Sequence, residues 1–345
     1  MERMRYLSIG RMLVTGGAGF IGSALIWELN RRGFSNIFAV DLLNKTEKWK
    51  NLVPLRFEDY IEADRLETLL DDDRNLPSDI HTVFHLGACS STTETDAGYL
   101  IRNNYEYTKK LAKWSLRRNA RFIFASSAAT YGALESDLTE SRELHSLRPL
   151  NMYGYSKHLF DCYAEASGIL ERIIGLKYFN VFGPNEDHKG DMRSVVNKAF
   201  SQIRETGAVQ LFRSYRPDFA DGRQQRDFLY VKDAVKMTVH LAELDAAGGL
   251  FNIGSGVAHT WLDLANAIFA ALGKEPKIEF IDMPEALRAK YQYSTRAEMG
   301  RFRATGYSEA PTPLVAAVSD YVRNYLVPGR KLGDEDRVAA AENLV

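Results

Sequence analysis

Cysteine is scarce in this sequence. The 345 residues include only two, Cys89 and Cys162, and these do not form a Cys-x-x-Cys pair. Such a composition argues against a structural zinc site and fits a reducing compartment. The seven histidines, among them His85 and His158, show no spacing typical of metal ligands. We therefore expect no bound metal.

Long hydrophobic runs and an excess of one charge are also missing. No apolar stretch approaches the roughly 20 residues of a membrane-spanning helix, and Met1 to Gly10 lacks the apolar centre of a signal peptide. Lys and Arg number 44 against 45 Asp and Glu, a net charge of -1. Nucleic acid and membranes are therefore not expected partners, and we expect a cytoplasmic globular protein with one large core or two unequal ones.

A glycine-rich loop follows the first predicted strand. Residues 11–15 are a short apolar run, Gly16, Gly19 and Gly22 follow, and residues 24–32 have helical periodicity. These glycines allow a tight turn and a close approach of the backbone to a pyrophosphate at the helix N-terminus. A second strand ends in Asp41, about 20 positions past the loop, where a carboxylate can bond ribose hydroxyls. The pattern predicts a bound dinucleotide.

The identity of that dinucleotide stays open between NAD and NADP. Asp41 favours NAD, because a carboxylate repels the 2′-phosphate of NADP. Lys45 and Lys48 follow closely in the sequence, and either could neutralise this phosphate or simply belong to a solvated loop.

Further strands, each followed by a polar or small-residue cluster, are predicted at 82–86, 121–125 and 172–178, with helices at 99–118 and 153–166 between them. This alternation predicts an α/β fold, a doubly wound parallel Rossmann sheet, with a smaller, discontinuous α/β substrate domain. We predict that the Rossmann domain comprises residues 1–179 and 227–257 and that the substrate domain comprises residues 180–226 and 258–328. Residues 329–345 are predicted to form a flexible tail.

Tyr153 and Lys157 stand four residues apart at the start of the predicted helix 153–166. This spacing places both on one helix face, where the ammonium can lower the pKa of the phenol and make it a proton carrier. Alone, the pattern favours a plainer interpretation, a packed aromatic beside a solvated lysine. Ser127, at the end of a central strand, supplies a hydroxyl for a reacting oxygen and supports catalysis.

By these motifs the chain resembles the extended short-chain dehydrogenase/reductase family along nearly its whole length. Residues 15–22, Ser127 and the Tyr153-x-x-x-Lys157 pair match its cofactor loop and catalytic triad. Residues 87–94, 125–132 and 188–190 are similar to those of the branch that epimerises ADP-heptose for lipopolysaccharide. The resemblance implies an isomerase in which a tightly held NADP (or NAD) takes a hydride from C6 of the heptose and returns it to the other face. It also implies a homo-oligomer.

The same resemblance assigns roles to residues of this sequence. The implied catalytic residues are Ser127, Tyr153, Lys157 and Lys189. The implied cofactor-binding residues are Gly16, Gly17, Gly19, Phe20, Ile21, Gly22, Asp41, Leu42, Lys48, Leu86, Gly87, Ala88, Cys89, Ser90, Asn103, Tyr153, Lys157 and Val181. The implied substrate-binding residues are Ser90, Asn180, Lys189, Asp191, Lys198, Phe212, Ser214, Arg226 and Tyr291.

Epimerisation requires proton transfer on both faces of one carbon, which a single base serves poorly. Tyr153 and Lys189, from different predicted domains, would answer this need, although Lys189 alone could be a solvated loop lysine. Two other functions share the fold. A nucleotide-sugar 4-epimerase or 4,6-dehydratase would have the same triad, but a dehydratase usually has an acidic pair where Ala128 and Ala129 follow Ser127. A non-catalytic NAD(P)-binding sensor is the third possibility.

Overall fold

The computed structural model describes residues 6–245, 247–288 and 291–335 of the chain. A seven-stranded sheet forms its centre, in the order β10-β6-β5-β4-β1-β2-β3, and every neighbouring pair is parallel. Its strands are β1 (Arg11–Thr15), β2 (Ile37–Asp41), β3 (Asp59–Glu62), β4 (Ile80–His85), β5 (Arg121–Ser127), β6 (Ile174–Tyr178) and β10 (Gly249–Ile253). The predicted α/β Rossmann fold is confirmed.

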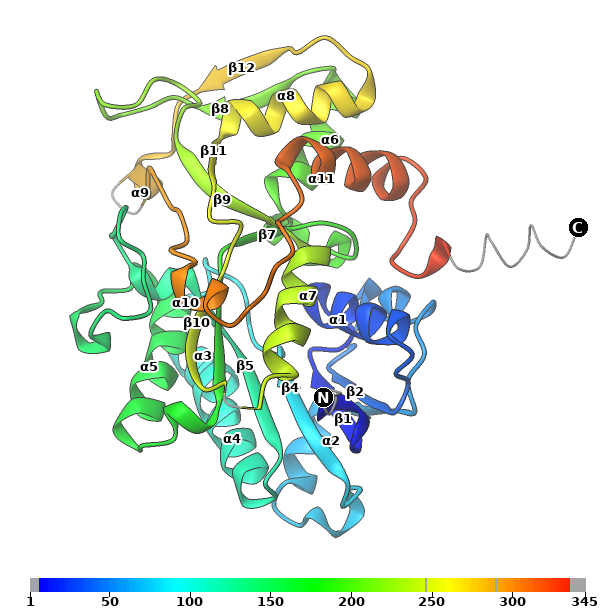
Figure 1. Ribbon diagram of the computed structural model, residues 1–345. Coiled ribbons are helices and arrows are strands. Elements are labelled where there is room, and N and C mark those ends of the chain that lie inside the picture. Colours follow the sequence, from blue (N-terminus) through cyan, green and yellow to red (C-terminus); the bar gives the residue numbers. More distant parts are fainter. Residues whose placement is uncertain (1–5, 246, 289–290, 336–345) are drawn as a thin grey trace, which may run out of the picture.

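Helices cover both faces of this sheet (Figure 1). The main ones are α1 (Phe20–Arg31), α2 (Ala63–Leu69), α4 (Tyr107–Arg117), α5 (Met152–Ala166) and α7 (Val231–Ala242). Helices α1 and α7 pack against each other, whereas α5 packs against β5 and the turn of helix before α4. Because both faces are covered, β2, β6 and β10 are buried along their whole length, as expected for a parallel sheet.

The chain order places several loops at the same edge of the sheet. The glycine loop follows β1, residues 86–91 follow β4, and Ser127 is the last residue of β5. Because the carboxyl ends of parallel strands meet at one edge of a sheet, these three segments are neighbours. A hydrogen bond from Leu86 N to Thr15 O, at 3.1 Å, joins the ends of β4 and β1.

Two small sheets lie outside the central one. They are formed by β7 (Asn180–Phe182), β9 (Gln225–Tyr230) and β11 (Ala258–Thr260), and by β8 (Val209–Phe212) with β12 (Ile278–Ile281). Helices α6 (Val195–Thr206), α8 (Trp261–Leu272) and α11 (Leu314–Asp320) lie beside them. We predicted that residues 227–257 belong to the Rossmann domain. In this range β9 pairs with β7 and β11, whereas α7 packs on α1 and β10 pairs with β6 of the central sheet.

The predicted helix 99–118 is interrupted. It comprises α3 (Ala97–Leu100), a π-helical stretch (Ile101–Glu106) and α4. The buried Asn104 lies in this π-helical stretch and bonds Cys89 through both its amide atoms, donating to Cys89 O at 2.9 Å and accepting from Cys89 N at 2.8 Å. Helix α7 and strands β3, β8 and β12 were not predicted. The three strands have only 4 residues each, but α7 has 12 residues with apolar side chains at helical spacing and was missed in spite of this signal.

The predicted tail 329–345 is wrong for its first part. Leu332 is fully buried in the core, and its N–H donates to Asn185 Oδ1 at 3.1 Å. The charged residues around it suggested a solvated segment, but an apolar side chain and specific partners hold it. Residues 336–345 of the predicted tail lie outside the described residues. Within the described part, none of the helices has the length and apolar character needed to cross a membrane.

Candidate active site

A cavity of about 390 Å³ lies at the carboxyl edge of the central sheet. The residues lining it are Gly16, Gly19, Phe20, Ile21, Gly22, Asp41, Thr46, Lys48, Leu86, Gly87, Ala88, Cys89, Ser90, Ser91, Ala125, His188, Lys189 and Met192. Most of the residues predicted to bind the cofactor are thus brought to one place.

Close packing explains why the loop needs glycine at two positions. A Cβ added to Gly22 would lie 1.9 Å from Gly16 O, deep inside the backbone of the turn. Gly16 has φ +70, and a Cβ there would lie 2.7 Å from the backbone N of Gly87. The loop therefore folds tightly on the start of α1 and on the segment after β4, and leaves a cradle at the helix N-terminus that suits a diphosphate.

Three donors hold the carboxylate of Asp41 at the end of β2, one of them Leu42 N, which lies 2.7 Å from Oδ1. Ala18 N donates to its Oδ2 at 3.0 Å, and the ammonium of Lys48 lies 2.6 Å from its Oδ1. Lys45 is exposed to solvent, so of the two lysines only Lys48 lines the cavity. A buried carboxylate beside a half-buried ammonium gives this part of the cradle both an acceptor and a cation.

Some predicted cofactor residues are not among the described residues that line this cavity. They are Gly17, Leu42, Asn103, Tyr153, Lys157 and Val181. Gly17 N donates to Val40 O, Leu42 N donates to Asp41 Oδ1, and Asn103 Nδ2 donates to Tyr99 O. These contacts lie within the protein, so the roles of these residues toward a cofactor stay predictions.

Ser127, Tyr153 and Lys157 are positioned by β5 and by the first two turns of α5. Asn151 caps this helix, accepting a hydrogen bond from Gly154 N at 2.8 Å, which fixes where the helix begins. Lys157 Nζ donates to Ala125 O at 2.8 Å, so the helix is tied to the strand that carries Ser127.

The expected pKa of Tyr153 was wrong in direction. Burial raises the pKa of the phenol above its ordinary value, and Ser127 opposes this rise. Burial also lowers the pKa of Lys157 to about 8. Spacing along the helix predicted the pairing of a phenol with an ammonium, but the removal of both groups from water outweighs it in this structure.

Lys189 lies where two cavities meet. It lines the large cavity and also a second one of about 220 Å³, to which Asn180, Val181 and Trp261 contribute. Its ammonium lies 5.4 Å from the centre of the Phe20 ring, and burial lowers its pKa. An amine with a lowered pKa gives up its proton more easily than a solvated lysine, so Lys189 can exchange a proton at this junction.

The predicted substrate residues are more dispersed. Arg226 is buried, has the rings of Trp261 (5.6 Å) and Tyr291 (5.1 Å) beside its guanidinium, and donates from Nη1 to Gln225 O at 2.7 Å. Trp261 Nε1 donates to Tyr291 OH at 2.9 Å. A buried guanidinium between two aromatic rings is suited to an anionic ligand.

Asp191, Lys198, Phe212 and Ser214 have contacts within the protein. Lys198 Nζ donates to Asp191 O at 3.3 Å, Phe212 is the last residue of β8, and Ser214 Oγ donates to Arg216 O at 3.0 Å. None of the four is among the described residues that line either cavity.

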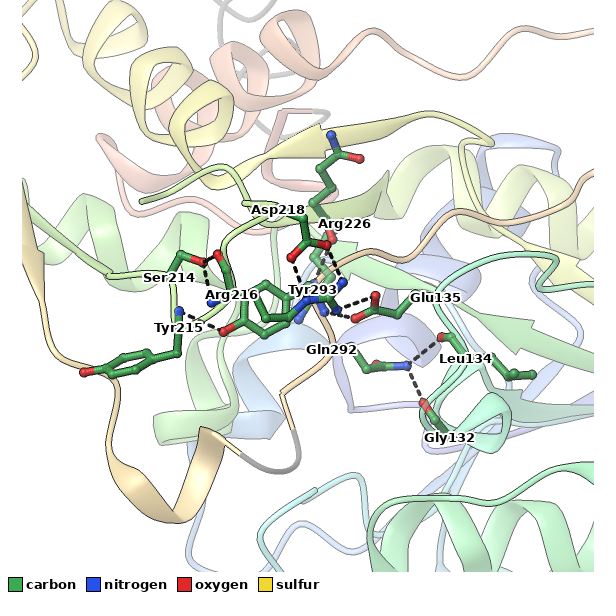
Figure 2. Close-up of polar contacts among 11 residues, drawn as sticks. Gly132, Leu134, Glu135, Ser214, Tyr215, Arg216, Asp218, Arg226, Gln292 and Tyr293 are labelled. Atoms are coloured by element: carbon green, nitrogen blue, oxygen red, sulfur yellow. Dashed lines mark hydrogen bonds and ion pairs between the residues drawn. The ribbon is translucent and has the colours of Figure 1, made fainter. Parts of the chain in front are cut away.

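Figure 2 shows how the loop after β8 meets the segment that follows β5. Arg216 Nη1 lies 2.7 Å from Glu135 Oε2, and its guanidinium stacks 4.8 Å from the Tyr293 ring. Glu135 Oε1 accepts a hydrogen bond from Tyr293 N at 2.7 Å, and Gln292 Nε2 donates to Gly132 O. Residues 291–293 are thus held against residues 132–135.

Sequence reasoning missed several residues of this site. His188, Met192 and Ala125 line the large cavity, and Trp261 and Phe228 line the second one. His188 had a signal, because it is next to Lys189; burial lowers its pKa to about 4, which leaves the imidazole neutral. Trp261 and Glu135 had no such signal in the sequence, because their places in the site depend on contacts with segments that are distant along the chain.

Comparison with known proteins agrees with this geometry. The model of the NAD dependent epimerase/dehydratase family matches residues 12–254, most of the chain. The chain belongs to the NAD-dependent epimerase/dehydratase family. Within this family, an ADP-L-glycero-D-manno-heptose-6-epimerase of Nitratidesulfovibrio vulgaris (strain Hildenborough) is 52% identical over 320 residues, which cover 91% of this chain and 97% of the relative.

Solved structures of other epimerases have the same fold. The ADP-L-glycero-D-manno-heptose-6-epimerase of Helicobacter pylori has a TM-score of 0.77 at 25% identity, covering 93% of this chain and 99% of that one. The UDP-glucuronic acid 4-epimerase of Bacillus cereus, solved in complex with NAD, has a TM-score of 0.73 at 26% identity, covering 91% and 99%.

Proposed function

We propose that this chain converts ADP-D-glycero-D-manno-heptose to ADP-L-glycero-D-manno-heptose by epimerisation at C6. The observation that carries the proposal is the position of Lys189, which lines both the cavity of the glycine loop and the adjoining cavity. The names of the relatives supply the substrate class. Such a reaction would serve lipopolysaccharide synthesis in the cytoplasm.

The residues around the larger cavity fit a nicotinamide dinucleotide. The glycine loop would hold its diphosphate, Asp41 its adenosine ribose, and residues 86–90 the part nearer the reaction. When bound, the nicotinamide supplies a reversible acceptor for the hydride of C6. We propose NADP as the natural cofactor, with Lys48 at its 2′-phosphate; identifying the dinucleotide released from denatured protein tests this choice against NAD.

Proton transfer falls to the side chains of the chain itself. Oxidation at C6 would release the hydroxyl proton together with the hydride and leave a ketone. Epimerisation then requires the hydride to return to the opposite face of C6 while the oxygen regains a proton. Tyr153 and Lys189 would carry the proton, one on each face, with Ser127 bonding the reacting oxygen and Lys157 holding Tyr153. The two carriers come from different segments, one on α5 and one after β7.

Arg226 gives the proposal an anchor for the nucleotide. Its buried guanidinium would bind the diphosphate of the ADP group, and Tyr291 and Trp261 would keep the guanidinium in place. Asn180, which lines the second cavity, and Ser90, which lines the first, would contact the sugar. We propose that Asp191, Lys198, Phe212 and Ser214 complete the substrate site.

The decisive experiment follows the stereochemistry of C6 by NMR after the purified protein is incubated with ADP-D-glycero-D-manno-heptose. Appearance of the L-glycero epimer supports the proposal. Loss of water from the sugar would identify a dehydratase, and an unchanged sugar beside a bound dinucleotide would identify a sensor. The proposal includes a homo-oligomer, which sedimentation analysis of the same preparation tests.

A further inference from the structure

The segment that carries Lys189 begins at a buried residue with an unfavourable backbone. Asn185 is 1% exposed and has φ +77, in the left-handed region that residues with side chains seldom adopt. A conformation of this kind persists only where the surroundings fix it. The contacts of Asn185 therefore decide where the segment leading to Lys189 lies.

Those contacts reach three different parts of the chain. Asn185 Nδ2 donates to Ser23 Oγ of α1 at 3.0 Å, and Asn185 Oδ1 accepts from Leu332 N at 3.1 Å. The backbone oxygen of Asn185 accepts from Asn51 Nδ2 at 3.0 Å, and the same Asn51 amide donates to Ala18 O in the glycine loop at 3.0 Å. Asn185 thus joins the Lys189 segment to the elements that form the cofactor cradle.

Residues 331–335 add further contacts to α1 and to the segment that carries Lys189. Besides the bond from Leu332 N, Lys331 forms an ion pair with Asp187, two residues before Lys189. Trp27 Nε1, on α1, donates to Glu335 Oε1 at 3.2 Å. Because Leu332 is fully buried, residues 331–335 are packed between α1 and residues 185–187 and do not merely lie over them.

We propose that residues 331–335, which we call the C-terminal brace, act through Asn185 to hold Lys189 at the junction of the two cavities. Asn185 is a positioning residue, because it touches Ser23, Asn51 and Leu332 and acts through the segment that it anchors. On the far side of Lys189, Ser194 donates through its N and Oγ to Glu186, so the segment folds back on itself, and Asn185 ties it to α1 and to the brace. The inference rests on the proposed role of Lys189 in epimerisation.

Two truncations of the full chain test the brace. A chain ending at Arg330 loses every brace contact, whereas a chain ending at Glu335 keeps all of them and serves as the matched control. For the shorter chain we expect kcat for epimerisation to fall roughly 10- to 100-fold, as misplacement of a catalytic group by about 1 Å does, with KM changed less than about twofold. The control should behave as the full chain.

Asn185→Gly provides the second variant, in case the shorter chain does not fold. Glycine accepts φ +77 without strain, so the backbone conformation stays available while the bonds to Ser23 and Leu332 are lost. We expect the same loss of kcat. We also expect trypsin to cut the native variant after Lys189 roughly fivefold faster than wild type, because the segment opens more often; mass spectrometry of the released peptides measures this rate.

The two readouts separate the brace from the proposed function. Wild-type rates of epimerisation and of cleavage after Lys189 in Asn185→Gly would overturn the brace. If wild-type protein leaves ADP-heptose unchanged, the proposed function fails, and the tryptic rates alone decide whether the brace holds the segment. Faster cleavage of Asn185→Gly with an unchanged kcat would show that Asn185 anchors the segment but that catalysis by Lys189 does not depend on this anchoring. This result would also overturn the inference.

Discussion

Arg216 and Glu135 lie 81 residues apart in the sequence, yet Nη1 of one is 2.7 Å from Oε2 of the other. The contact joins the loop after β8 to the segment after the strand of Ser127, and the other oxygen of Glu135 accepts from Tyr293 N (Figure 2). Glu135 therefore fixes the segment that presents Tyr291 to Arg226.

Replacing Glu135 should weaken binding of the nucleotide sugar more than it slows catalysis. In Glu135→Ala, the N–H of Tyr293 loses its acceptor and Arg216 loses its ion pair with residue 135 while that with Asp218 stays, so Tyr291 is less well placed against Arg226. Loss of one or two such bonds costs about 1–2 kcal/mol, which corresponds to a KM increase of roughly 10-fold with kcat nearly constant. Glu135→Gln keeps an acceptor for Tyr293 and should show a smaller increase. Steady-state kinetics measures both, and equal KM values for all three proteins would contradict the assignment.

Lys189→Ala should abolish epimerisation while the dinucleotide stays bound. The variant removes one of the two proposed proton carriers but leaves the glycine loop and Asp41 unchanged. The NMR assay of C6 and the absorbance of the released dinucleotide measure the two properties. Lys274→Ala, at an exposed lysine after α8, is the control for loss of a lysine as such. Wild-type turnover by Lys189→Ala would exclude the two-carrier mechanism.

Lys157 should make the stability of the protein depend on pH on the alkaline side. Its pKa is lowered from 10.5 to about 8 in the folded chain, because burial disfavours the charged form. Between these values the unfolded chain binds a proton that the folded chain releases, so the free energy of unfolding rises with pH in this range. Below about pH 8 the cost of the buried charge is fully present.

The variant Lys157→Met removes that titration. Its stability relative to wild type should be highest near about pH 7 and should decline by roughly 3 kcal/mol as the pH approaches about 10.5. Urea unfolding of both proteins at a series of pH values measures the difference. A difference independent of pH would show that the folded chain does not lower the pKa of Lys157.

Gly22→Ala should destabilise the glycine loop and abolish dinucleotide binding. The new methyl group would lie 1.9 Å from Gly16 O, a distance that only a shift of the backbone can relieve. Gly300→Ala is the matched control, because a Cβ at Gly300 meets nothing within 4 Å and its φ is unremarkable. We expect a loss of about 1–3 kcal/mol of stability in Gly22→Ala alone, measured by chemical unfolding. Full retention of bound dinucleotide by Gly22→Ala would contradict the tight turn.

The sequence by itself determined the parts of this protein that depend on neighbours along the chain. The glycines at 16, 19 and 22, Asp41 at the end of the next strand and the spacing of Tyr153 and Lys157 each occupy one short segment, and periodic apolar residues marked the strands between them. Local spacing was therefore enough to predict the Rossmann sheet and most of the residues around its cavity.

Only the tertiary structure decided what depends on contacts between distant segments. It placed Lys189 at two cavities, paired Arg216 with Glu135, and packed Leu332 into the core where we predicted a tail. It also reversed the expected pKa shift of Tyr153, because spacing along a helix says which groups are neighbours but not how much water surrounds them. The burial of a side chain depends on how the whole chain packs, so it cannot be predicted from the short segment around that residue.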